Sequence, residues 1–302
     1  MLRNIAVFSM RGRWQAAVVI ALLSVAALML PPLSYLASGV IALCTLRVGP
    51  KEGVKVVVAS VVIMTLLTGL LLNQFLISGL FLLTSWLPVL GISLVLGYTR
   101  SLAASLLAGS GLGVVIVMGT YLVLPDPTQW WQQLLAPFLE MISEQPGWNL
   151  DQEQTQVLSM GLSGMMTGLI AAGVSINVML GLIIGRAWQA KLYNPGGFTD
   201  EFYQFRLGKF AALFTVVLMV ITLSPLSDSL AVLRECLPVA LVVFALQGLS
   251  VVHAIVKQRQ KHTFWLVAVY VLLVVMMPQM VVLLAMIGVL EQWFNFRKHS
   301  IE

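Results

Sequence analysis

Long apolar runs follow one another along this chain, separated by short segments of charged residues, prolines or polar clusters. The runs cover about 14–30, 33–46, 54–72, 75–97, 101–124, 157–185, 210–227, 236–256, 264–277 and 279–292. A helix needs about 20 apolar residues to cross a bilayer. The pattern therefore predicts an all-α fold, a polytopic transmembrane helical bundle with nominally ten crossings and at least eight. Residues 1–302 then form a single integral membrane domain.

Two short stretches leave the crossing number open. Run 33–46 is short for a full span, and we interpret it as the second half of a hairpin turned by Pro31-Pro32. Stretch 264–292 is either one long helix kinked at Pro278 or two half-length helices that turn there. We favour two helices, because they return the basic C-terminal residues to the side of the other bases.

The composition excludes a water-soluble protein. Of the 302 residues, 59% are apolar and only 10% are charged, and the mean hydropathy is +0.96. Soluble domains average about 45–50% apolar and about 25% charged residues. So few polar residues cannot cover the surface of a soluble globule.

The net charge of +5 is spread unevenly. From Asp126 to Gln156 there are five acids and no Lys or Arg, whereas bases collect in segments such as 186–209 and 257–261. This distribution follows the positive-inside rule and argues against a nucleic-acid partner. We expect a bacterial inner-membrane protein with both termini cytoplasmic and membrane lipid as its partner. Residues 126–156 form an acidic outer loop and residues 186–209 a cytoplasmic connector.

The outer loop carries helical signals of its own. Asp126-Pro127 is typical of a helix start, and apolar residues then recur at helical spacing, among them Trp130, Trp131, Leu134 and Phe138. We predict an amphipathic helix over 128–142 in the outer membrane interface, where tryptophan is favoured. This helix either covers the end of the bundle or acts as a lid over an outward-facing cavity.

Small residues at four-residue spacing mark two runs expected in the bundle interior, because small residues let helices approach closely in lipid. The packing rows are Ser105, Gly109 and Gly113 in run 101–124, and Gly164 with Gly168 and Gly173 with Gly181 and Gly185 in run 157–185. Neutral polar residues within the runs are candidates to line a ligand cavity. They are Asn177, Gln247, Ser250 and Gln279. Each forms an interhelical hydrogen bond or faces a cavity.

Charged residues are nearly absent from the centres of the runs, where each costs about 2.5–3.5 kcal/mol on insertion scales. We interpret Arg234 and Glu235, near the start of a run, as an interfacial ion pair, and a proton-coupled pump is disfavoured. No HExxH, GxSxG or GxxxxGK[ST] motif occurs, and the histidines and cysteines lack metal-ligand spacing. We predict no enzyme activity, no cofactor and no metal.

Three stretches resemble the YybS-like family of bacterial membrane proteins, which has no assigned biochemical function. They are Leu46-Arg47-Val48-Gly49-Pro50-Lys51-Glu52-Gly53, then Tyr193-Asn194-Pro195-Gly196-Gly197-Phe198 with Glu201-Phe202 and Arg206-Leu207, and finally the segment 288–298. Glu291 in the last stretch stands where many relatives are expected to carry aspartate. The resemblance covers the whole chain in layout.

The N-terminal layout is also similar to the S components of energy-coupling factor vitamin transporters. The shared features are a small-residue first helix, a short second run and an R-x-G-x-x-x-G turn from Arg47 to Gly53. In that family the Ala-rich first helix contacts the coupling subunit. The resemblance implies that Ala17 and Ala21 are partner-contact positions.

Three functions are compatible with these features. The first is a transport-type binder of a small neutral or apolar solute that works with an energy-supplying membrane partner, since the chain carries no nucleotide motif. The alternative is a non-catalytic assembly or scaffold protein that binds another membrane protein through its glycine rows. A lipid-handling enzyme is the third hypothesis.

Overall fold

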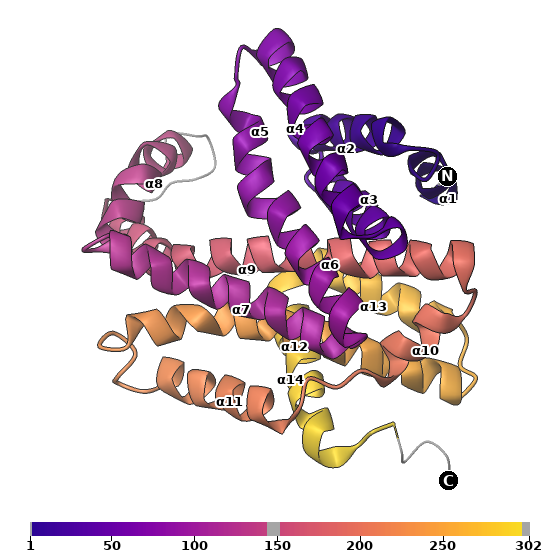
Figure 1. Ribbon diagram of the computed structural model, residues 1–302. Coiled ribbons are helices and arrows are strands. Elements are labelled where there is room, and N and C mark those ends of the chain that lie inside the picture. Colours follow the sequence, from indigo (N-terminus) through magenta and orange to yellow (C-terminus); the bar gives the residue numbers. More distant parts are fainter. Residues whose placement is uncertain (1, 144–151, 298–302) are drawn as a thin grey trace.

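The computed structural model describes residues 2–143 and 152–297, and within these stretches every regular element is a helix (Figure 1). The elements are α1 (Leu2–Ser9), α2 (Arg13–Ala27), α3 (Leu33–Val48), α4 (Pro50–Leu72), α5 (Leu76–Phe81), a π-helical turn (Leu82–Trp86), α6 (Leu87–Thr99), α7 (Leu102–Val123), α8 (Pro127–Ser143), α9 (Gln152–Tyr193), α10 (Gly197–Gln204), α11 (Lys209–Leu223), α12 (Ala231–Gln258), α13 (Phe264–Val275) and α14 (Met277–Phe294). The predicted all-helical bundle is confirmed, and each apolar run falls on one or more of these elements.

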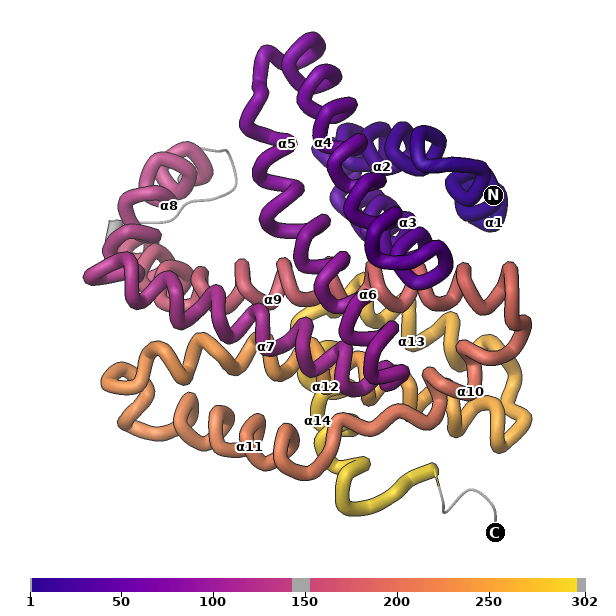
Figure 2. The backbone as a smooth tube through the Cα atoms, in the orientation of Figure 1, coloured from indigo at the N-terminus to yellow at the C-terminus, as the bar shows by residue number. Residues whose placement is uncertain are grey.

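The 42-residue helix α9 lies at the centre of the bundle. Helices α7 and α12 run beside it and α11 packs along α12, whereas α4 and the α5–α6 segment form a hairpin that stands across this group (Figures 1 and 2). Helix α3 packs between α9 and the hairpin. The buried apolar core follows these contacts from α2 to α14.

Small residues set the closest helix contacts. A Cβ atom added at Gly181 would overlap Ser38, and one added at Gly185 would overlap Ala42. The residue numbers of the two contacting pairs, 38 with 181 and 42 with 185, increase in the same direction along both helices. Helices α3 and α9 therefore run parallel. On other faces of the bundle, Gly113 of α7 and Gly168 of α9 also leave too little room for a side chain, and a Cβ atom at Gly109 would lie 3.2 Å from the Met179 side chain. These contacts agree with the packing predicted for the two runs.

The predicted ten crossings exceed the number of helices that are long enough to cross a membrane. Among the described residues, six helices are long and apolar enough to cross a membrane, and the count reaches seven if the bent pair α10–α11 is one span. Helices α2, α3 and α13 have 15, 16 and 12 residues. At about 1.5 Å per residue, none of the three matches a hydrocarbon core of about 30 Å. The long apolar helices indicate a multi-pass membrane protein.

Stretch 264–292 forms two helices. The break falls at Met276, whose φ of −124° and ψ of 50° leave the helical region, and Pro278 lies in the first turn of α14. Proline is compatible with a first turn because no intrahelical N–H is needed there. The single long helix is thereby excluded.

The predicted connector 186–209 is mostly helical. Its first part belongs to α9, and α10 packs against α12. Helices α10 and α11 meet at an angle of 52° across residues 205–208. Gly208 has a φ of +95°, which glycine adopts without strain. This non-helical link lies beside the middle of α12, because the Leu207 N–H donates to Gln247 Oε1 at 2.8 Å.

The prediction that Ala17 and Ala21 contact a partner is contradicted. Both side chains are fully buried, because α2 turns them towards the rest of the chain, where it packs against α3 and α4. They serve packing within this chain. The exposed apolar side of α2 instead carries Trp14, Val18 and Leu22.

Candidate functional site

Asn177 lies where the glycine row of α9 meets the start of α3. The close approach at Gly181 and Gly185 brings α3 against α9, and Asn177 comes opposite Ser34 in the same parallel register. The Asn177 side-chain amide therefore faces α3 inside the bundle.

Three serines bind the Asn177 amide. Its Oδ1 atom accepts hydrogen bonds from Ser85 at 2.9 Å and Ser38 at 3.1 Å, and its Nδ2 atom donates to Ser34 at 2.7 Å. The hydroxyls of Ser38 and Ser85 are 2.8 Å apart. These contacts tie α9 to α3 and to the π-helical turn, so the first alternative for Asn177, an interhelical hydrogen bond, is present.

The π-helical turn between α5 and α6 positions Ser85. Turns of this kind insert one residue into a helix and occur often at functional sites. In this chain the turn places Ser85, which is 5% exposed, on the buried side of the helix next to the fully buried Trp86. The neighbouring Thr84 faces the adjacent cavity.

A cavity of about 370 Å³ opens beside this polar cluster. It is lined by Ala27, Pro31, Ser34, Leu80, Phe81, Thr84, Ser85, Leu169, Ile170, Gly173, Val174 and Asn177. No lining residue is charged. The second alternative for Asn177 is therefore also present, because the amide takes part in the serine cluster and lines the cavity.

Gly173 lines the cavity and does not pack as predicted. A Cβ atom at this position would meet no neighbouring atom within 4 Å. In the register that pairs Asn177 with Ser34, Gly173 lies before the first residue of α3, Leu33. The glycine row of α9 therefore has no α3 residue opposite Gly173, and the space beside Gly173 is part of the cavity.

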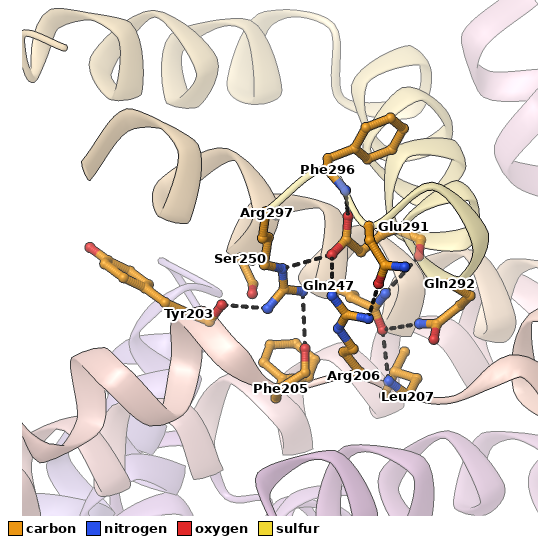
Figure 3. Close-up of polar contacts among 12 residues, drawn as sticks. Tyr203, Phe205, Arg206, Leu207, Gln247, Ser250, Glu291, Gln292, Phe296 and Arg297 are labelled. Atoms are coloured by element: carbon orange, nitrogen blue, oxygen red, sulfur yellow. Dashed lines mark hydrogen bonds and ion pairs between the residues drawn. The ribbon is translucent and has the colours of Figure 1, made fainter. Parts of the chain in front are cut away.

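Gln247 and Ser250 belong to a second polar cluster, shown in Figure 3. The Gln247 Nε2 atom donates to the Gly288 carbonyl oxygen at 2.6 Å, and its Oε1 atom accepts from Leu207 N and from Gln292 Nε2. Ser250 donates to the Phe202 carbonyl oxygen at 2.7 Å. Both side chains are fully buried, and these bonds hold α10, the 205–208 link and α14 against α12.

Glu291 is the fully buried carboxylate of this cluster. Its Oε1 atom lies 3.0 Å from Arg206 Nη2 and 3.1 Å from Arg297 Nε, and its Oε2 atom accepts from Phe296 N at 2.7 Å. Arg297 also donates to the carbonyl oxygens of Tyr203 and Phe205, at the C-terminal end of α10 (Figure 3). A cation is favourable there because it opposes the negative end of the helix dipole.

The predicted ion pair between Arg234 and Glu235 does not form, and Glu235 is a second buried carboxylate. Its Oε1 atom accepts from the Tyr121 hydroxyl at 2.5 Å and its Oε2 atom from Gly168 N at 2.8 Å. Arg234 instead pairs with Asp228 at 3.0 Å and donates to the Gly164 carbonyl oxygen at 2.9 Å. The two neighbouring charges therefore bind different partners near the start of α12.

Gln279 is exposed at the start of α14 and lies apart from both clusters. Helix α8 is present over the predicted segment, and Trp131 donates to Thr167 of α9 at 2.9 Å. Trp130, Leu134 and Phe138 form an exposed apolar side of α8. Residues 144–151 of the predicted loop lie outside the described part of the chain, and residues 152–156 belong to α9.

The serines around Asn177 and the glycine pair at the α12–α14 contact were not predicted from the sequence. Serine is common in membrane helices, so Ser34, Ser38 and Ser85 gave no distinct signal. Gly248 and Gly288 lie on different runs, and their pairing depends on how α14 crosses α12. In residues 2–143 and 152–297, no group of three His, Cys, Asp or Glu side chains could hold a metal ion.

Comparison of the chain with models of protein families, with curated proteins and with solved structures found no match.

Proposed function

We propose that this chain is a transport-type membrane protein that binds a small neutral solute in the cavity beside Asn177. The observation that carries the proposal is the combination of an uncharged cavity and a fixed amide–serine cluster between α3, α9 and the π-helical turn. Ligand sites are typically apolar cavities with a few convergent polar groups.

The cavity limits the chemistry of the solute. Its volume of about 370 Å³ is near the lower end of the range for ligand sites, about 300–1,000 Å³. The Asn177 amide nitrogen carries two hydrogens, and one of them is directed at Ser34. The other can donate to a carbonyl, ether or hydroxyl oxygen. A charged solute would lie in the cavity without a counter-ion, at a high desolvation cost.

The energy source of transport is assigned to a membrane partner. Since Ala17 and Ala21 are buried, a partner that binds α2 has to contact its exposed side chains Trp14, Val18 and Leu22.

The orientation in a bacterial inner membrane is part of the proposal. Arg47 stacks on Tyr193 at 3.9 Å, and Arg186 pairs with Glu201 of α10 at 2.8 Å. The C-terminal Arg297 contacts that same helix. The basic segments thus meet at one end of the bundle, as expected for a cytoplasmic face. In this orientation α3 and α9 both run from the outer side to the cytoplasmic side, which agrees with their parallel packing.

Reporter fusions test the orientation. We expect cytoplasmic readings for fusions after Arg100 and after Lys261 and at Glu302, and an outer reading within 145–149. The last two sites lie outside the described residues. Paired phosphatase and fluorescent-protein fusions give opposite signals at each site. An outer reading at Glu302 would contradict the proposed arrangement of α13 and α14.

The substitution Gly173→Leu tests the solute site. The new side chain enters open space and fills part of the cavity, so we expect folding to be retained and the solute-induced rise in melting temperature to disappear. The measurement is a thermal-shift screen of neutral metabolites and vitamins in detergent, followed by titration of each compound that shifts the wild type. Gly161→Leu is the matched control, because that glycine also has no neighbour within 4 Å and lies on the same helix away from the cavity. A shift that survives Gly173→Leu, or a screen in which no compound shifts the wild type, contradicts the proposal.

A further inference from the structure

A second cavity, of about 530 Å³, lies against the C-terminal polar cluster. It is lined by Asp200, Tyr203, Gln204, Arg206, Ala254, Lys257, Gln258 and Arg297. An adjoining cavity of about 290 Å³ shares two of these residues and adds His253, Val256, Gln260, Lys261, Thr263 and Leu266. Both cavities are at the end of the bundle where the basic segments meet, and neither shares a residue with the cavity at Asn177.

Positive charge exceeds negative charge around these cavities. The cations are Arg206, Lys257, Lys261 and Arg297, and the carboxylates are Asp200 in the lining and Glu291 directly behind it. One carboxylate, Glu291, lies between two guanidinium groups and can neutralise only one of them (Figure 3). Burial lowers the pKa of Arg297 while Glu291 acts in the opposite direction, and a guanidinium stays protonated in proteins. The local charge is therefore positive by two.

In the larger cavity, Lys257 is the cation available for direct contact. Its Nζ atom is 3.7 Å from Asp200 and 5.2 Å from the centre of the Tyr203 ring. Both charged side chains of that pair are more than half exposed, and such a pair is weak in water. Arg206 and Arg297, in contrast, use their terminal nitrogens to hold the cluster and the end of α10. They supply a fixed positive field behind Lys257.

From this arrangement we propose that the larger cavity binds a phosphate group, either that of an anionic lipid headgroup or a free phosphate ion. Lysine is a common phosphate ligand, and basic pockets between membrane helices on the cytoplasmic side bind anionic headgroups. Gln204 and Gln258 line the same cavity and add neutral donors. The exposed Phe264 and Trp265 lie at the start of α13, close in sequence to Thr263, and are suited to the headgroup region.

The test compares Lys257→Gln with Arg259→Gln in purified full-length chain. Both changes remove one positive charge from the end of α12, but Arg259 lines neither cavity. Melting temperature in non-ionic detergent is followed during titration with phosphatidylglycerol, phosphatidylcholine or inorganic phosphate at constant ionic strength. We expect Lys257→Gln to weaken the phosphatidylglycerol response about fivefold and Arg259→Gln to leave it unchanged. Asp200→Asn, which removes the competing carboxylate, should strengthen it.

The outcomes separate the possible ligands. A Lys257-dependent response to phosphatidylglycerol alone identifies a lipid headgroup, whereas an equal response to inorganic phosphate identifies a free phosphate. Equal effects of Lys257→Gln and Arg259→Gln would overturn the proposal, since they show only general attraction to a basic surface. The absence of a Lys257-dependent response to either ligand would also overturn it. These results do not depend on whether a solute binds at Asn177.

Discussion

Replacement of Gly248 by alanine is expected to destabilise the chain by about 3 kcal/mol, the upper part of the usual range for overpacking. A Cβ atom at this position would overlap the Leu284 carbonyl oxygen, and one at Gly288 would overlap the Phe244 carbonyl oxygen. These oxygens belong to helix backbones, which cannot rotate away as a side chain can. Helix α14 must therefore move off α12, and the bond from Gln247 to the Gly288 carbonyl oxygen is lengthened or lost.

Thermal unfolding in detergent measures this effect. Cys44 and Cys236 are free and buried, so a thiol-reactive fluorophore reports their exposure on unfolding. Gly119→Ala in α7 is the control, because no atom lies within 4 Å of its added Cβ. Alanine there should leave the melting temperature unchanged or raise it, by up to about 1 kcal/mol in stability. Equal melting temperatures for Gly248→Ala and wild type would contradict the close α12–α14 contact.

Local spacing was sufficient to predict much of the packing. The rows containing Gly109 and Gly181 were identified because four-residue spacing places small side chains on one helix face, whatever that face contacts. The same rule predicted a packed Gly173, and the resemblance to S components implied a partner-facing Ala17. Both predictions failed because the partner of a face depends on where neighbouring helices begin and turn. Helix α3 begins too late to reach Gly173, and α2 turns Ala17 inward.

The candidate site was predicted only in part, again because the partners of a residue depend on how the helices are arranged. Asn177 was recognised because an amide in an apolar run needs a partner, but its serine partners come from α3 and from the π-helical turn, 92 or more residues away in sequence. The charged clusters were missed because charges were weighed only at the run centres. Glu235 and Glu291 lie near helix ends, yet folding buries both of them. Distance from the centre of a run is therefore a poor measure of exposure where helices break or cross inside the bundle.

The break between α10 and α11 explains why the chain retains a buried Glu291. Residues 205–208 lie outside regular helix, and lipid cannot satisfy the backbone groups that lack a helical partner there. Leu207 N is bound by Gln247, and the carbonyl oxygens of Tyr203 and Phe205 are bound by Arg297. A buried Arg297 in turn requires a nearby negative charge. Glu291 supplies that charge and links the C-terminal segment to the break.

Replacement of Glu291 by glutamine should therefore cost about 3–5 kcal/mol, because it leaves the buried Arg297 and the more exposed Arg206 without a carboxylate. Glutamine keeps the size and an oxygen acceptor for Phe296 N, so the loss reports charge and not volume. The fluorophore assay gives the melting temperature, and Glu52→Gln is the control, since Glu52 forms an exposed pair with Lys55 and its loss should leave the melting temperature nearly unchanged.

A double substitution separates charge balance from general damage at this position. Adding Arg206→Gln to Glu291→Gln removes one of the two uncompensated cations, so the double variant should be more stable than Glu291→Gln alone. Arg206→Gln by itself should destabilise less than Glu291→Gln, because Arg297 then keeps Glu291 as its counter-ion. The four melting temperatures form a double-mutant cycle. Strictly additive losses would show that Arg206 and Glu291 do not interact, and would contradict the charge balance proposed for this pair.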